Sequence, residues 1–493
     1  MTAIVNQLKR AISFLNREDG SLQKRTIRSG IWVIFANIGV NSLAFIRSIV
    51  LARLLLPEIF GLISIAMIVV RGLELFTQTG FAAALIHRQK GFDEAKDTAF
   101  TLMVIRGCLL FLITFIASPF IADFYDKSIL DAVIKIIAIS FIFKGFRNIN
   151  AISYEKGLNF KKISYLEQSV AVINTIFVIV FAYYFRNVWA LVIGNLFSNF
   201  VAALLSYLFI PGKPKFEFKK NIAKELFTYG KFVFGLSIIM FVSSEIDHVL
   251  IGKILGIEML GYYFLAYTLA NLVSTQLSRL VSRVMLPAYS LLQNDLPALN
   301  EAFLKVFKLL SFIAIPASAG MIVLAPEIML AVYGEKWLPA AGALQVLCVF
   351  GAVRAITALT GYLLNGIGKP NVPFYASLCR LFIAVILIYP LTKMFGLVGA
   401  AWSVTTAMLT AFIIVVYLLT RLIELDALNL LKILTSILFN SMVMSLSVLL
   451  IKNQFELINI YTLIFLVSIG MVVYCLLNFK YFYYELRNEI FRK

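Results

Sequence analysis

The sequence predicts an all-α polytopic membrane protein with about fourteen transmembrane helices. Hydrophobic residues make up 61% of the 493 residues and charged residues only 14%, whereas soluble domains average about 45–50% and about 25%. Long apolar runs recur along the whole chain, and each approaches the roughly 20 residues that a helix needs to cross a bilayer. Basic residues gather in alternate loops between these runs, as expected for a membrane protein.

The apolar runs form three groups: six in the first half, six in the second half, and two more at the C-terminal end. The predicted spans cover residues 29–51, 61–85, 99–118, 130–149, 166–185, 189–209, 231–251, 262–286, 309–332, 341–365, 374–392, 397–419, 433–451 and 460–477.

The distribution of lysine and arginine tests both the number of spans and their orientation. With fourteen spans and a cytoplasmic N-terminus, the cytoplasmic segments hold 29 of the 44 basic residues and the outer loops hold seven. A missed or invented span would invert every later loop and remove this bias. We therefore expect a multi-pass protein of the inner (cytoplasmic) membrane with both termini in the cytoplasm.

A short pattern occurs twice, 200 residues apart. The first copy reads RLLLPEIFG from Arg53 to Gly61, and the second reads KILGIEMLG from Lys253 to Gly261. Arg147 and Arg354 also both fall in the fourth predicted span of their half. Six intervening spans, an even number, give both copies the same orientation. The repeat predicts two pseudo-symmetric six-helix lobes around a central cavity, which is a transporter architecture.

The longest polar interruption, PGKPKFEFKKNIAKELFTYG within residues 210–230, separates the two halves and is strongly basic. The N-terminal segment carries apolar residues at helical spacing among its lysines and arginines, which is typical of an amphipathic helix on the membrane surface; a disordered basic tail is the alternative. The predicted organisation is an amphipathic segment (1–28), an N-lobe (29–209), a cytoplasmic linker (210–230), a C-lobe (231–419), two extra helices (420–478) and a cytoplasmic tail (479–493).

Several function classes are excluded by composition and motifs. The net charge of +18 does not indicate a nucleic-acid partner, because the basic residues fall between apolar runs. The four cysteines lie far apart in apolar runs, so neither a disulfide nor a metal site is expected. GxSxG and HExxH are absent, and the glycine spacing from Gly361 to Gly366 is followed by Ile367 rather than lysine, so no nucleotide site is expected. We expect no resident cofactor; H⁺ or Na⁺ as a coupling ion stays open.

Besides the residues at span ends that are counted with the cytoplasmic segments, eight basic residues lie inside the predicted spans. A charge near the bilayer centre costs about 2.5–3.5 kcal/mol. A long side chain near a span end avoids this cost by extending its charge to the interface. We expect this of three residues: Arg106, Lys135 and Arg380. The other five are expected to face a cavity and bind substrate: Arg47, Arg71, Arg279, Arg283 and Arg354.

The seventh predicted span holds an acidic cluster of Glu245 and Asp247 with His248. Such a cluster can bind a coupling H⁺ or Na⁺. The alternative is an ion pair with Arg279 or Arg283 on the next span, which would be purely structural. Elsewhere, Glu74 is a further candidate for ion coupling, or it neutralises the arginine three residues before it.

Several stretches resemble the polysaccharide-export flippases of the multidrug/oligosaccharidyl-lipid/polysaccharide (MOP) superfamily. They are FIRSIVLARLLLPEIFGLISIAMIVV (45–70), LFTQTGFAAALIHRQ (75–89), YEKGLNFKKISYLE (154–167), the linker and LNGIGKPNVPFY (364–375). The resemblance covers residues 24–479 and lies in the overall pattern. Lipid II flippases of the superfamily carry an arginine in the first helix followed by an Ala-Arg pair, which Arg47 and Ala52-Arg53 match. The acidic residue that follows that arginine there is Ser48 here.

The resemblance implies a transporter, not an enzyme. Its substrate would be an undecaprenyl-diphosphate-linked oligosaccharide repeat unit, moved from the inner to the outer leaflet for capsule, exopolysaccharide or O-antigen synthesis by alternating access. Membrane lipids, a polymerase and a chain-length protein are the expected partners. Arginine binds phosphate through paired hydrogen bonds, so a cationic cavity suits this substrate.

Two other functions compete with this interpretation. A cation-coupled multidrug exporter of the same superfamily would have about twelve helices and favour an acidic cavity, whereas this chain has two extra helices and an excess of arginine in its spans. A membrane polymerase or glycosyltransferase would need a large outer loop, and no outer loop here exceeds roughly a dozen residues, an ordinary connection length.

Overall fold

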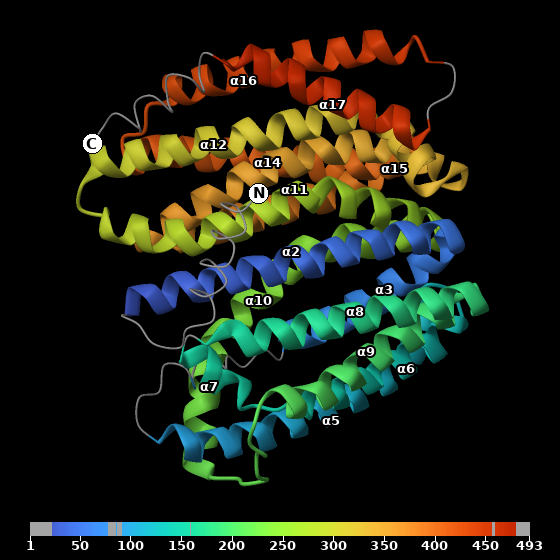
Figure 1. Ribbon diagram of the computed structural model, residues 1–493, viewed down its shortest axis with the longest axis vertical. Helices are drawn as coiled ribbons and strands as arrows, with labels where there is room; N and C mark the ends of the chain where they lie inside the picture. The colour runs from blue at the N-terminus through green and yellow to red at the C-terminus, as the bar shows by residue number, and fades with distance from the viewer. Residues whose placement is uncertain (1–21, 77–84, 86–90, 158, 456–458, 480–493) are drawn as a thin grey trace, which may run out of the picture. The chain divides into compact units, whose positions relative to one another are not determined.

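The computed structural model describes residues 22–76, 85, 91–157, 159–455 and 459–479. The regular structure in these ranges is entirely helical (Figure 1). Most of the predicted amphipathic segment and of the predicted C-terminal tail lies outside the described residues, as does the end of the second predicted span.

Among the described residues, eight helices occupy the first half of the chain. They are α2 (Leu22–Leu54), α3 (Pro57–Phe76), α5 (Phe92–Phe124), α6 (Ile129–Gly145), α7 (Ala151–Lys156), α8 (Phe160–Phe185), α9 (Val188–Phe209) and α10 (Lys220–Ile254).

Nine further elements follow. They are α11 (Ile257–Leu291), α12 (Leu296–Val323), α13 (Ala325–Ile328), the π-helix η1 (Met329–Tyr333), the 3₁₀-helix η2 (Glu335–Ala340), α14 (Ala341–Gly366), α15 (Asn371–Leu422), α16 (Ala427–Lys452) and α17 (Ile460–Leu477).

Each of the fourteen predicted spans overlaps one of these helices. Within the described ranges, nine helices are long and apolar enough to cross a membrane, which confirms an all-helical multi-span membrane protein. One of the nine, α15, covers two predicted spans and bends at Gly396, where φ is 58° and ψ is −135°. A left-handed φ of this kind favours glycine, so the sequence itself places the bend. Fourteen crossings remain a prediction.

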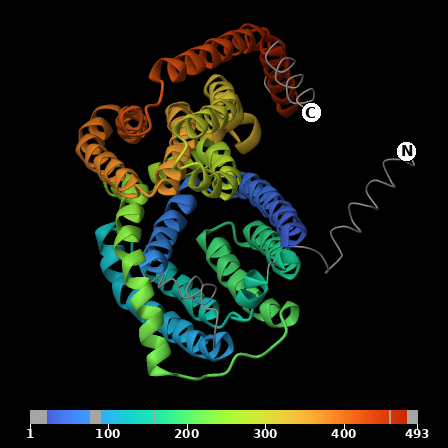
Figure 2. The same cartoon turned by 90° about the vertical axis from the view of Figure 1, so that its left-hand side faces the viewer.

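Two compact units divide the chain. Unit 1 comprises the described residues of Met1–Leu55 and Ala66–Ile238, and unit 2 comprises Leu56–Ile65 and those of Ile239–Lys493. In unit 1, α5 packs on α6, and α8 packs on α2 and α9. In unit 2, α14 packs on α11, α12 and α15, and α16 lies against α12 and α17 (Figures 1 and 2). The two helices without a counterpart in the repeat are therefore part of unit 2.

The two copies of the sequence repeat meet within unit 2. A Cβ atom on Gly61 would lie 1.9 Å from the carbonyl oxygen of Ile257, and one on Gly261 would lie 1.9 Å from that of Pro57. Each glycine thus lies against the first residue of the other copy's helix, because α3 begins at Pro57 and α11 at Ile257. Only glycine allows two backbones to approach so closely, which explains why both copies end in this residue.

An extended stretch, residues 211–219, joins α9 to α10 within unit 1 (Figure 2). Alternate backbone amides of this stretch donate hydrogen bonds to side chains of α5, as expected for an extended chain with a period of two. α10 begins at Lys220, inside the predicted linker, because Ile222 and Ala223 pack in an apolar cluster with α5. The amide-to-side-chain pairs are Lys215 to Asp97 at 3.1 Å, Glu217 to Thr101 at 3.0 Å and Lys219 to Thr98 at 3.3 Å.

Candidate binding site

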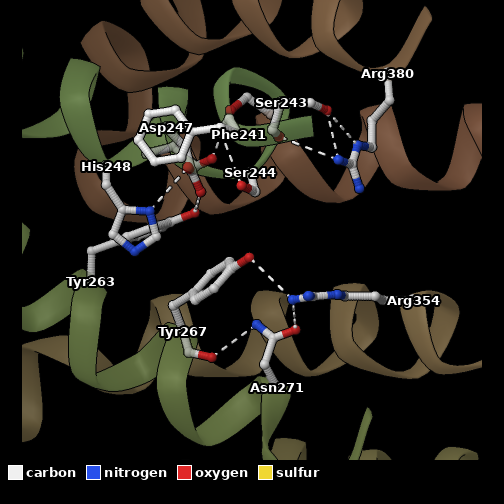
Figure 3. A network of polar contacts seen from close by, with 12 residues as sticks. Phe241, Ser243, Ser244, Asp247, His248, Tyr263, Tyr267, Asn271, Arg354 and Arg380 are labelled. Atoms are coloured by element: carbon white, nitrogen blue, oxygen red, sulfur yellow. Dashed lines mark hydrogen bonds and ion pairs between the residues drawn. The ribbon is translucent and has the colours of Figure 1, made fainter. Parts of the chain in front are cut away.

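A small polar cavity lies within unit 2 among α10, α11, α14 and α15 (Figure 3). Its volume is about 50 Å³, which is room for a few water molecules or one small polar group. The apolar part of the lining includes Phe350 and Val404. The polar part consists of Ser243, Ser244, Asp247, Tyr267, Arg354 and Arg380.

Arg354 reaches the cavity from α14. Its Nη1 donates to Asn271 Oδ1 at 2.8 Å and to the Tyr267 hydroxyl at 3.3 Å. The Asn271 amide is itself oriented, because its Nδ2 donates to the backbone oxygen of Tyr267 at 2.9 Å. One turn of α11 therefore presents two neutral oxygens to the guanidinium, which leaves the charge of Arg354 oriented but not neutralised.

Arg380 reaches the same cavity from α15. Its Nε and Nη2 donate to Ser243 Oγ at 3.1 and 2.6 Å, and Nη2 also donates to the Ser243 backbone oxygen at 3.3 Å. The expectation that Arg380 extends to the membrane interface is therefore wrong. The Ser243-Ser244 pair in the apolar α10 was the signal that could have revealed it, because hydroxyl pairs in such a helix indicate a polar partner.

Asp247 is the acidic member of the cavity lining and is 4% exposed. Its Oδ1 lies 3.0 Å from His248 Nδ1, and its Oδ2 accepts a 2.7 Å hydrogen bond from the Tyr263 hydroxyl. The His248 ring meets that of Tyr267 edge to face at 4.8 Å between centroids. Figure 3 shows Asp247, His248 and Tyr263 gathered on one side, with Arg354 on another.

The two guanidiniums share one electrostatic property. In the part of the chain that the structure describes, neither Arg354 nor Arg380 forms a salt bridge; their hydrogen-bond partners are neutral oxygens and the Met408 sulfur. Two half-buried cations with neutral partners carry an electrostatic cost that a bound anion removes. The cavity can therefore bind an anionic group through arginine hydrogen bonds.

The other residues predicted to bind substrate are distributed differently. Arg47 is half-buried on α2 and, among the described residues, has no hydrogen-bond or salt-bridge partner, whereas Arg71 is exposed on α3. The side chains of Arg279 and Arg283 lie outside the described residues, although both positions are in α11. Arg354 is the member of the five predicted substrate-binding arginines that the structure places in the cavity lining.

The residues predicted to couple ions also lie in different parts of the structure. Asp247 lines the cavity, and His248 lies beside it as its hydrogen-bond partner. Glu245 is half-buried on the same helix, α10. Glu74 belongs to unit 1, where its carboxylate pairs with Lys144. The backbone oxygen of Glu74 also accepts a 2.9 Å hydrogen bond from Arg106 Nη2.

Comparison with known proteins identifies the family. A family model described as polysaccharide biosynthesis protein matches residues 50–342. The chain belongs to the polysaccharide biosynthesis protein family. The chain also resembles the teichuronic acid biosynthesis protein TuaB of Bacillus subtilis (strain 168), which is 26% identical over 72% of this chain and 74% of TuaB. The lipopolysaccharide biosynthesis protein WzxC of Escherichia coli (strain K12) is 25% identical over 77% of both chains.

Two solved structures show which fold this polysaccharide biosynthesis protein has. The lipid II flippase MurJ in an inward closed conformation superposes with a TM-score of 0.75, at 18% identity, over 93% of this chain and 99% of MurJ. An inward-facing multidrug resistance MATE transporter of the MOP superfamily superposes with a TM-score of 0.62, at 16% identity, over 84% of this chain and 97% of that transporter. The predicted family is confirmed, and the fold resembles that of MurJ and of a MATE transporter. Other relatives are named as transporters rather than enzymes, among them the succinoglycan biosynthesis transport protein ExoT of Rhizobium meliloti (strain 1021).

Proposed function

We propose that this polysaccharide biosynthesis family protein is a flippase that moves undecaprenyl-diphosphate-linked oligosaccharide repeat units from the inner to the outer leaflet of the cytoplasmic membrane. Capsule, exopolysaccharide or O-antigen synthesis would use the product, and a polymerase and a chain-length protein would act on it next. The observation that carries the proposal is the cavity in which Arg354 and Arg380 have no carboxylate partner among the residues that the structure describes.

The site suits one part of such a substrate. A diphosphate carries two negative charges, and a guanidinium donates paired hydrogen bonds to phosphoryl oxygens. A cavity of about 50 Å³ is too small for a glycan or a polyprenyl tail, so it would receive a phosphoryl group alone. Arg47, Arg71, Arg279 and Arg283 are proposed to contact other parts of the head group during alternating access.

Ion coupling is the second element of the proposal. Asp247 lines the cavity and forms a buried, hydrogen-bonded pair with His248. Buried titratable groups of this kind in membrane transporters mark ion pathways. We assign the coupling H⁺ or Na⁺ to this pair. Glu245 and Glu74 are secondary candidates for the same role.

Both termini are proposed to lie in the cytoplasm, because the lysine and arginine tally favours that orientation. Single cysteines placed in residues 211–219 of the linker and beside Lys336 test it. A membrane-impermeant maleimide applied to intact cells is expected to label the second site and not the first. Labelling of the linker from outside would reverse the orientation.

Deletion of the gene in its host, with complementation from a plasmid, tests the transport function. Loss of the surface polysaccharide together with accumulation of its lipid-linked repeat unit is the expected result. Normal polysaccharide with increased sensitivity to cationic drugs would instead favour a multidrug exporter, the alternative suggested by the likeness to MATE transporters in fold.

A further inference from the structure

We propose that Tyr263 and His248 are positioning residues that hold Asp247 away from the anion site, and that Asp247 is an internal competitor for that site. Whenever this restraint is lost, the Asp247 carboxylate would form ion pairs with Arg354 and Arg380 in place of the anion. The inference deepens the proposed function, since it concerns the control of the same cavity.

Both oxygens of the Asp247 carboxylate are engaged by other groups. The Tyr263 hydroxyl donates to Oδ2 at 2.7 Å, and His248 Nδ1 lies 3.0 Å from Oδ1. Tyr263 is fully buried, and His248 is 3% exposed. A carboxylate held at both ends by buried, packed rings has little freedom to reorient, because every alternative orientation leaves a buried polar group without a partner.

The same carboxylate lies close to two cations with which it does not pair. Asp247, Arg354 and Arg380 line one cavity, and Asp247 is near enough to Arg380 to interact with it electrostatically. Carboxylate and phosphate are alternative ligands of the arginine fork. An unrestrained carboxylate at this position would therefore neutralise the guanidiniums and exclude an exogenous anion.

In a simple salt bridge the carboxylate and the arginine would be each other's partners, whereas here each has partners of its own. Tyr263 and His248 supply Asp247 with its hydrogen bonds, while Ser243 and Asn271 supply those of the arginines. The anion affinity of the cavity then depends on residues that do not touch the anion. It should fall when the restraint on Asp247 is removed and recover when the charge of Asp247 is removed as well.

Tyr263→Phe is the informative change, because it removes the hydroxyl and keeps the ring. Full-length protein in detergent is titrated with inorganic phosphate by calorimetry. The loss of one hydrogen bond to a charged group predicts roughly tenfold weaker phosphate binding. Adding Asp247→Asn to Tyr263→Phe should restore the wild-type affinity to within about threefold. A purely structural role for Tyr263 predicts no such recovery.

Tyr262→Phe is the matched control. Tyr262 precedes Tyr263 on α11, and its hydroxyl donates to Glu258 at 3.2 Å, outside the cavity. Phosphate binding should be unchanged in this variant. Thermal unfolding of every variant, monitored by intrinsic fluorescence, distinguishes a loss of phosphate binding from a loss of folded protein.

Three results would overturn the inference: no phosphate binding by the wild-type protein, unchanged binding in Tyr263→Phe, or a double variant that binds as weakly as the single one. Failure of the proposed function is a separate outcome. In that case phosphate binding and its recovery would behave as described, while deletion of the gene would leave the surface polysaccharide intact.

Discussion

A half-buried ion pair of unit 1 and the cavity of unit 2 both contain charged side chains of apolar helices, but the partners of these charges differ. In unit 1, Lys144 pairs directly with the carboxylate of Glu74. At the cavity of unit 2, Asp247 is held by a tyrosine and a histidine while Arg354 and Arg380 bond to neutral groups. A direct ion pair stabilises the fold and leaves little charge for a ligand. Separate neutral partners keep the charge oriented and available, so we propose that the phosphoryl group binds in the cavity of unit 2.

Arg147 and Arg354, which both fall in the fourth predicted span of their half, have similar partners and differ in location. Arg147 Nη2 donates to Asn199 Oδ1 at 3.3 Å, and Arg354 Nη1 donates to Asn271 Oδ1 at 2.8 Å. Both arginines thus have an asparagine partner. Arg147, however, lies beyond the end of α6 and is exposed, whereas Arg354 is in the middle of α14 and lines the cavity.

The largest expected effect comes from removing the two cavity arginines. Arg354→Ala with Arg380→Ala should reduce polysaccharide export by at least roughly a hundredfold, since each lost charged hydrogen-bonding group costs about 1.5–3 kcal/mol. Lysine at both positions should restore export partly, because it keeps the charge and loses the fork. Quantification of surface polysaccharide at matched protein levels measures this. Arg147→Ala is the control from unit 1, and an equal loss there would remove the contrast between the units.

A direct ion pair of unit 2, Glu327 with Lys452 at 2.6 Å, should affect stability and not transport. Glu327 is 8% exposed, so Lys452→Met would leave a nearly buried carboxylate unpaired and lower the free energy of unfolding by about 3 kcal/mol. Adding Glu327→Gln should recover most of this loss. Thermal unfolding in detergent measures both changes, and a non-recovering double variant would contradict the explanation.

A smaller effect is expected for the corresponding pair of unit 1. The Lys144 and Glu74 side chains are each 31% exposed, so Lys144→Met should lower the free energy of unfolding by about 1–2 kcal/mol, less than the nearly buried pair. The same thermal unfolding assay applies. If export fell as far as in the cavity variants, Glu74 would have a role in transport after all, and the comparison of the two units would need revision.

Features that depend on short-range pattern could be predicted from the sequence. Run lengths and charge placement predicted a helical membrane protein, and the repeated Gly61 and Gly261 predicted two related segments. Both features are local or periodic, and each backbone hydrogen bond of a membrane helix is closed within its own segment. The bend of α15 at Gly396 likewise falls between two predicted spans.

The partners of the site residues required the tertiary structure. The sequence suggested an arginine of the next span as a partner for the cluster of Glu245, Asp247 and His248, and that pairing stays a prediction. The bonds of Asp247 to His248 and to Tyr263 of α11 became visible only in the structure. Position along the chain suggested that Arg380 extends to the interface, whereas Ser243 holds it at the cavity. The sequence by itself determined which charges lie in the helices, because that depends on composition and period. Which charges neutralise one another and which remain available to a ligand was decided by contacts between helices, because those depend on packing across residues far apart in the chain.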